Sequence, residues 1–135
     1  MAERNTLPLP SDAQLEVLNI IWQRGESTVG EVWEEFTARR PVARNTVLTL
    51  IARLEEKGWL QRHRKGSVHR YRASIPQATA MRQFVRRLVD TAFRGSAEGL
   101  IMTLLGSGDL DEGEAERIQA MLDKTRRERK GRSKP

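Results

Sequence analysis

The spacing of hydrophobic residues changes abruptly at Gly58. Before it, apolar residues recur at intervals of three and four, which predicts a helix over about residues 43–57. The buried face of this helix would consist of Val47, Leu50, Ile51 and Leu54. After Gly58 the period falls to two over residues 59–64 and again over residues 68–73, and turn residues 65–67 separate the two runs. The chain is therefore expected to form a helix followed at once by a β-hairpin.

Two further helices are predicted before this pair of elements. The segments Ser11-Asp12-Ala13-Gln14 and Thr28-Val29-Gly30-Glu31 have the spacing of a capping box, in which the first and fourth side chains bond to each other's backbone amides. Apolar residues at helical spacing follow each segment, and Gly25 and Pro41 end the two runs. Three helices and a hairpin therefore make up a predicted first domain, residues 1–73.

The remainder of the chain is predicted to be helical. Pro76 opens a long helix, Ser96 caps a shorter one, and Asp111 begins a third. Residues 74–123 form this helical region, whereas residues 124–135 are a basic tail that is expected to be disordered. The predicted fold class is mainly α with a small β-hairpin.

Positive charge is segregated along the chain rather than mixed with negative charge. The net charge is −5 over residues 1–38, +8 over residues 39–72, −3 over residues 73–123 and +6 over residues 124–135. A surface that only needs to be solvated would mix the two signs. The segregation therefore indicates an anionic partner, and it favours nucleic acid over a membrane.

The helix over residues 43–57 has the properties of a DNA-recognition helix. An α-helix fits the major groove of B-DNA, and its N-terminal half usually reaches the base edges. Asparagine can pair with adenine, threonine with a base or a phosphate, and arginine with guanine or a phosphate. The residues predicted to lie close to DNA are Arg44, Asn45, Thr46, Thr49 and Arg53. Considered alone, this segment is better explained as an ordinary amphipathic surface helix. The helix that precedes it by a short turn and the basic hairpin that follows it favour DNA binding instead.

The hairpin after this helix is unusually basic for a structural element. Its candidates for phosphate contact are Arg62, Arg64, Lys65, Arg70 and Arg72. Neighbours on a strand point to opposite faces, so not all five can touch DNA at once. Two helices, a short turn and this hairpin together indicate a winged helix-turn-helix. His63 and His69 could face each other across the hairpin, but two ligands make an incomplete site and no metal is predicted.

Several classes of protein are disfavoured by what the sequence lacks. It contains no cysteine, which excludes disulfides, thiolate metal sites and cysteine nucleophiles. No apolar run approaches the roughly 20 residues that cross a bilayer, and no signal peptide is apparent, so a cytoplasmic protein without membrane insertion is expected. No phosphate-binding glycine loop and no nucleophile–base set occurs at a recognisable spacing. The chain is therefore predicted to be neither an enzyme nor dependent on a cofactor.

These residues resemble the penicillinase-repressor family, which includes the β-lactamase, methicillin-resistance and copper-responsive repressors. The resemblance rests on residues 45–58, with the spacing T-x-x-T-x-x-x-R-L-x-x-K-G, and on Val68-His69-Arg70-Tyr71 in the hairpin. Leu15-Glu16-Val17-Leu18 also fits the family pattern, together with Ile21-Trp22. The similarity covers residues 10–73 in detail and the helical region in layout only.

The resemblance implies a homodimeric transcriptional repressor on a palindromic operator, with the C-terminal helices as the dimer interface. Two-fold symmetry doubles the number of base contacts, which is a physical reason to dimerise. The predicted interface residues are Phe84, Leu88, Leu100, Ile101, Leu104, Leu105, Ile118 and Leu122. The alternative is that these helices only cover the N-terminal domain.

The sequence departs from the family pattern in three places. Copper-responsive members carry a C-terminal cysteine cluster, which this chain lacks. β-Lactam-responsive members are inactivated by cleavage of an Asn-Phe bond, where this chain has Thr103-Leu104. A membrane sensor protease thus stays a candidate partner without support from the residues. Asn45 occupies a place where the family often has a basic residue, so the operator sequence is not carried over.

A second function stays open beside sequence-specific repression. The basic tail fits a nucleoid or RNA-binding protein that holds double-stranded DNA or RNA by charge alone. Such a protein would bind all sequences equally and with a steep dependence on salt. A winged helix that binds only proteins is disfavoured, because it would not need so much positive charge.

Overall fold

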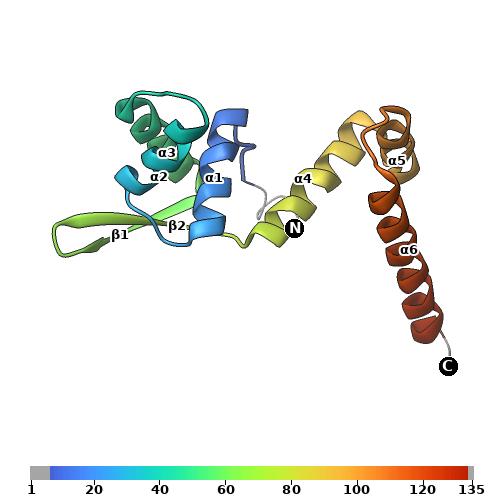
Figure 1. Ribbon diagram of the computed structural model, residues 1–135. Coiled ribbons are helices and arrows are strands. Elements are labelled where there is room, and N and C mark those ends of the chain that lie inside the picture. The colour runs from blue at the N-terminus through green and yellow to red at the C-terminus, as the bar shows by residue number, and fades with distance from the viewer. Residues whose placement is uncertain (1–6, 134–135) are drawn as a thin grey trace. The chain divides into compact units, whose positions relative to one another are not determined.

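Among residues 7–133, which the computed structural model describes, three helices, a hairpin and three more helices follow in the predicted order (Figure 1). They are α1 (Asp12–Arg24), α2 (Val29–Arg39), α3 (Arg44–Lys57), β1 (Leu60–Lys65), β2 (Val68–Ala73), α4 (Gln77–Ala92), α5 (Ala97–Gly106) and α6 (Glu112–Ser133). The chain divides within α4 into an N-terminal unit that ends at Arg86 and a C-terminal unit that begins at Arg87. The predicted fold class is confirmed.

Capping boxes start the first two helices, as the sequence predicted. The backbone amide of Gln14 donates to Ser11 Oγ at 3.2 Å, and the amide of Ser11 donates to Gln14 Oε1 at 2.9 Å. Thr28 and Glu31 repeat this exchange at 3.2 Å and 2.9 Å. Each box satisfies amides that the first helical turn leaves without a partner, so both helices begin at defined residues.

One apolar core holds α1, α2, α3 and the hairpin together. Its buried members are Val17, Leu18, Ile20, Ile21, Val32, Phe36, Val47, Ile51, Leu54, Trp59, Leu60, Tyr71 and Ala80. Val47, Ile51 and Leu54 form the inward face of α3, as predicted, while Leu50 lies at its margin and is partly buried. Each large apolar side chain that is fully covered stabilises the fold by roughly 1.5–3 kcal/mol. α3 is thus anchored along one face, and its other face is displayed to solvent.

The first part of α4 belongs to the N-terminal unit. Ala80 is buried in the core, and the ring of Phe84 lies 5.4 Å from that of Trp59 at an interplanar angle of 56°. The indole of Trp22 also donates to the carbonyl of Ile75, just before α4, at 2.9 Å. The division of the chain therefore comes later than residue 73, where the sequence placed it. Phe84, which was expected at a dimer interface, is partly buried and packs against this core.

The hairpin forms an antiparallel ladder with a glycine at its turn. Leu60 pairs with Ala73 at the base and Lys65 with Val68 at the tip, where Gly66 takes a positive φ of 67°. A residue before α2 extends this sheet, because Ser27 exchanges backbone hydrogen bonds with Tyr71 at 2.9 Å and 2.8 Å. The wing is thereby tied to the helices at its base, and its tip projects beyond them (Figure 1).

The C-terminal unit has very little core. Among its described residues, Val89 is the one buried hydrophobic side chain. Ser96 caps α5 by accepting from the amide of Gly99 at 2.9 Å, and Asp111 accepts from the amide of Glu114 at 2.7 Å at the start of α6. Both caps were predicted. None of the helices in residues 7–133 combines the length and hydropathy that a membrane span requires.

The expected disorder of residues 124–135 is not what the structure shows, because α6 continues as a helix to Ser133. Arginine, lysine and glutamate, which dominate this stretch, are all good helix formers. High charge had favoured the prediction of a frayed end, but helix propensity over the same residues outweighs it. Residues 134 and 135 lie outside the described part of the chain.

Candidate nucleic-acid interface

The turn between α2 and α3 is fixed by side chains of α2. The indole of Trp33 donates to the carbonyl of Val42 at 2.9 Å, and the amide of Val42 donates to Thr37 Oγ1 at 3.3 Å. These two bonds fix the backbone of Val42, two residues before the start of α3. The angle at which α3 leaves the turn is therefore set by the core and not by a flexible loop.

α3 begins without a side-chain cap. Ala43 occupies the N-cap position and makes no side-chain hydrogen bond, and the first turn contains no acidic residue. The amides at a helix start carry a partial positive charge and bind anionic oxygens such as those of phosphate. The weak cap that the sequence showed thus leaves this end of α3 available to an anion.

The outward face of α3 carries the polar residues that were predicted. Arg44, Asn45, Thr46, Thr49 and Arg53 are all exposed. Thr49 Oγ1 donates to the carbonyl of Asn45 at 3.0 Å, so this hydroxyl retains its acceptor capacity for a ligand. The structure therefore brings together on one helix the five residues expected near DNA.

Sequence reasoning missed one residue on this face. Leu48 is 41% exposed and, at about 100° per residue, lies about 60° around α3 from Asn45. It falls outside the spacing of the buried stripe, which was the signal available in the sequence. An exposed apolar side chain on a recognition helix is suited to contact the methyl group of thymine. We therefore add Leu48 to the candidate interface.

The register of the hairpin separates the five basic wing residues onto two faces. Arg62 pairs with Tyr71, so Arg62 and Arg64 share the face that is buried at its base. Lys65, Arg70 and Arg72 lie on the opposite face. The five candidates are thus not equivalent, and their contacts within the protein distinguish them further.

Arg70 is held by two carboxylates of the N-terminal unit. Its guanidinium lies 3.3 Å from Glu26 and 3.4 Å from Glu31, and it is only 30% exposed. The pKa of Glu31 is lowered, first by the hydrogen bond from the Thr28 amide and then by the positive charges of Arg70 and Arg24. Arg70 therefore secures the wing to α2, and its charge is already compensated inside the protein.

The two histidines do not face each other. His63 pairs with Arg70 across the hairpin and Arg64 pairs with His69, which puts the two imidazoles on opposite faces. His63 Nε2 instead lies 3.0 Å from Glu26. The residues that the structure describes contain no group of three histidine, cysteine or carboxylate side chains that could hold a metal ion.

Two more wing arginines have partners, and two cations at the tip do not. Arg62 lies 3.4 Å from Glu55, and Arg72 donates to Gln61 Oε1 at 3.3 Å and 3.2 Å. Across residues 7–133, neither Arg64 nor Lys65 makes an ion pair or hydrogen bond with another side chain. The cations of the central basic block that serve the candidate interface and have no side-chain partner among the described residues are Arg44, Arg53, Arg64 and Lys65.

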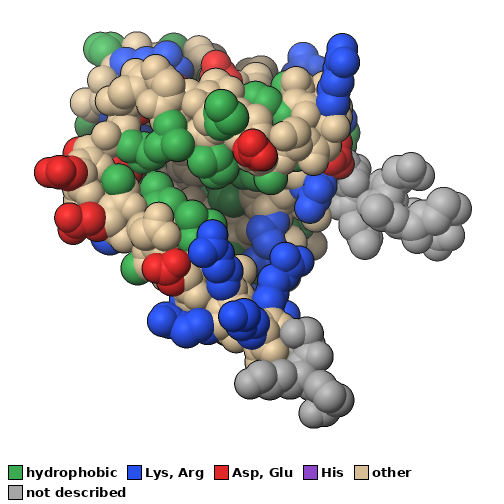
Figure 2. All heavy atoms as spheres, turned by 90° about the vertical axis from the view of Figure 1, so that its right-hand side faces the viewer, with side chains coloured by type: hydrophobic (Ala, Val, Ile, Leu, Met, Phe, Trp, Pro, Cys, Tyr) green, Lys and Arg blue, Asp and Glu red, His purple; other side chains and the backbone are tan. Residues whose placement is uncertain are grey.

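Of the residues expected at a dimer interface, those in the C-terminal unit are largely uncovered. Leu88, Ile101, Leu104, Leu105 and Leu122 are 44–57% exposed, while Leu100 and Ile118 are partly buried. Met102 and Met121, which the sequence analysis did not include, are the most exposed of the large apolar side chains, at 64% and 63%. Figure 2 shows apolar side chains gathered on the face turned to the viewer.

Comparison with known proteins places the chain in a family. The sequence profile described as penicillinase repressor matches residues 10–124. The methicillin resistance regulatory protein MecI of Mammaliicoccus sciuri is 25% identical over 84% of this chain and 93% of its own length. The penicillinase repressor of Bacillus licheniformis is 24% identical over 92% and 97%.

A solved structure adds a local match. The Bacillus licheniformis BlaI monomeric form in complex with the blaP half-operator is 33% identical over 54% of this chain and 89% of that chain, with a TM-score of 0.49. The profile match extends over both units and includes α3, the hairpin and most of the C-terminal helices. The chain therefore belongs to the penicillinase repressor family, a family of DNA-binding transcriptional repressors that are not enzymes.

Proposed function

We propose that this protein is a sequence-specific repressor that binds a palindromic operator as a homodimer. α3 lies in the major groove, with Asn45, Thr46, Leu48, Thr49 and Arg53 near the bases. The wing tip contacts the phosphate backbone through Arg64 and Lys65. The observation that carries the proposal is the exposed polar face of α3, which has an uncapped start and two arginines without an ion pair in the described part of the chain.

The C-terminal unit supports dimerisation. Its exposed large apolar residues are Leu88, Ile101, Met102, Leu104, Leu105, Met121 and Leu122. Monomeric soluble proteins rarely expose a contiguous apolar surface of more than a few hundred Å². A second copy of the same surface, related by a two-fold axis, would cover these side chains.

A gel-shift titration tests the proposal. The full chain is titrated against the DNA upstream of its own gene and against a scrambled duplex of equal length and composition. A specific repressor binds the first duplex more tightly by a factor of roughly 10³–10⁷. Equal affinity for the two duplexes would leave nonspecific binding by charge as the function.

Arg53→Ala is expected to weaken specific binding more than nonspecific binding. An arginine that bonds bidentately to a guanine contributes about 1–3 kcal/mol of discrimination, which is roughly a 5- to 150-fold loss of specific affinity. The matched control is Arg82→Ala, because Arg82 is an exposed arginine of α4. Equal losses on specific and scrambled DNA would make Arg53 a phosphate contact only.

The wing offers a second comparison, between its free and its paired cations. The double variant Arg64→Ala/Lys65→Ala is expected to lower the slope of log affinity against log salt by about 0.9 for each phosphate that a protomer no longer neutralises. Arg70→Ala is expected to lower the thermal midpoint and leave this slope nearly unchanged, because Arg70 is paired with Glu26 and Glu31. Fluorescence anisotropy over a salt series measures the slopes. The assignment is wrong if Arg70→Ala reduces the slope as much as the double variant does.

A further inference from the structure

The last third of α6 carries a block of positive charge that the winged helix does not explain. Between residues 124 and 132 there are six basic side chains and a single acidic one, Glu128. All seven of these residues are exposed. The family profile ends at residue 124, so this block lies at and beyond its limit, although the helix itself continues to Ser133.

Helix stability alone does not account for this block. Basic residues favour the C-terminal end of a helix, but the effect is confined to about the last turn, where α6 has Lys130 and Arg132. Arg126 and Arg129 lie before that turn. Arg126 is three residues from Arg129 and four from Lys130, and like charges at these spacings destabilise a helix by about 0.2–0.5 kcal/mol per pair. In the free protein these two like-charge pairs therefore cost stability, and a bound polyanion would relieve their repulsion.

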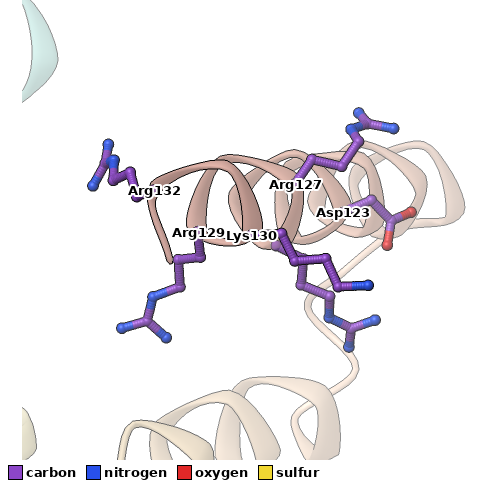
Figure 3. Close-up of a pocket in the computed structure, with 6 residues that line it drawn as sticks. Asp123, Arg127, Arg129, Lys130 and Arg132 are labelled. Atoms are coloured by element: carbon purple, nitrogen blue, oxygen red, sulfur yellow. The ribbon is translucent and has the colours of Figure 1, made fainter. Parts of the chain in front are cut away.

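Three of the basic side chains lie on one side of α6. At about 100° per residue, Arg126, Arg129 and Lys130 fall within a sector of about 100°, and Glu128 lies on the far side of the helix. Figure 3 shows Arg129 and Lys130 extending from the same side, with Arg127 on the other. An open hollow runs along this part of α6, lined by Asp123, Arg126, Arg127, Arg129, Lys130 and Arg132. We call Arg126, Arg129 and Lys130 the basic face of α6.

We infer that the basic face of α6 binds the phosphate backbone of duplex DNA outside the operator. The inference rests on the proposed function, because that function brings DNA to the protein. A homodimer would carry two such faces, which add affinity for any sequence through the release of counterions. The operator contacts of α3 then determine the DNA site at which the protein binds, and α6 increases the affinity through contacts with DNA outside the operator.

The composition of the block favours DNA over the other anionic partners. A helix that binds membranes places apolar or aromatic side chains opposite its basic face. The stretch 124–133 contains no hydrophobic residue. Protein interfaces likewise depend on buried aromatic or arginine anchors set among apolar contacts, which this stretch does not offer. A uniformly charged helix is suited to a uniformly charged, sequence-independent surface.

The experiment compares the full chain with two triple variants on DNA of arbitrary sequence. The test variant is Arg126→Gln/Arg129→Gln/Lys130→Gln. The control is Arg82→Gln/Arg94→Gln/Arg117→Gln, which removes the same charge from exposed positions elsewhere in α4–α6 and the connection between α4 and α5. Affinity for a scrambled duplex of about 40 bp, roughly four helical turns, is measured by anisotropy over a salt series. Circular dichroism and sedimentation confirm that helix content and oligomeric state are retained.

The test variant is expected to lower the slope of log affinity against log salt by about 2–3 per protomer, at about 0.9 for each phosphate that is no longer neutralised. The control is expected to change it by less than half as much. Equal slopes for the two variants would overturn the inference. A second result would also overturn it. If the test variant binds DNA as the unmodified chain does but no longer co-sediments with phosphatidylglycerol vesicles, the basic face of α6 binds a membrane instead. A failed proposed function is recognised separately, because the unmodified chain would then bind upstream and scrambled DNA equally.

Discussion

Replacing Ile51 with alanine is expected to lower the free energy of unfolding by about 2–5 kcal/mol. Ile51 is fully buried at the centre of the core that anchors α3. Removing its side chain leaves a cavity between helices that cannot close without moving α3. Small domains are stable by only about 5–15 kcal/mol, so the change removes a large part of the total. Urea denaturation followed by circular dichroism measures the loss.

A matched variant on the same helix separates stability from recognition. Leu48→Ala removes an aliphatic side chain of the same size, but Leu48 is 41% exposed and lies outside the core. Its effect on the free energy of unfolding is expected to stay within about 0.5 kcal/mol, as for most surface substitutions. Its effect on operator affinity is expected to be larger than its effect on stability. Equal destabilisation by Ile51→Ala and Leu48→Ala would contradict the assigned faces of α3.

The double variant Ile101→Glu/Leu105→Glu is expected to be monomeric and to bind the operator roughly 10²–10⁴-fold more weakly. Both side chains are about half exposed in the single chain, at 47% and 57%, and they lie on one face of α5. Two carboxylates on this face would have to be buried without partners in the proposed dimer, which is costly. Without the dimer, each half of the operator is bound by an independent subunit. Sedimentation velocity gives the mass, and a gel shift gives the affinity.

The control for this variant is Thr103→Glu. Thr103 is exposed on α5 about 200° around the helix from Ile101, so the new charge faces away from the proposed interface. The Thr103→Glu protein is expected to remain dimeric. If Thr103→Glu dissociates the dimer as readily as the double variant does, any negative charge on α5 disrupts dimerisation and the assigned face of α5 is wrong. If the double variant stays dimeric, the interface lies elsewhere.

Local signals in the sequence predicted the order of the elements well. Each capping box, the glycine at residue 58 and the change of period after it depend on residues within a few positions of one another. Both partners of such a short-range hydrogen bond lie within one short sequence motif, so the bond can be predicted from the sequence. The helix starts at Ser11 and Thr28 and the turn at Gly66 were therefore predictable before any tertiary contact was known.

What the sequence could not provide was the contacts between distant segments. The pairing of Arg70 with Glu26 joins residues 44 positions apart, and nothing local distinguishes Arg70 from Arg64. The same holds for Phe84, whose periodicity fits an interface helix but whose neighbour in space is Trp59. For Leu48 the two local signals disagree, because its spacing puts it outside the buried stripe but a leucine in an amphipathic helix is normally expected to be buried. The basic end of α6 was misjudged because charge density and helix propensity gave opposite indications.

The scarcity of buried side chains in the C-terminal unit has a consequence for how repression depends on the concentration of the protein. With Val89 as the one buried hydrophobic residue among those described there, this unit would gain much of its stability from the subunit it pairs with. In such a protein, folding and association are governed by mass action, and stability depends on protomer concentration. When protomers are scarce, the concentration of functional dimer then rises with the square of the concentration of free protomer. A modest fall in synthesis would thus release the operator more sharply than a protein stable as a monomer would allow.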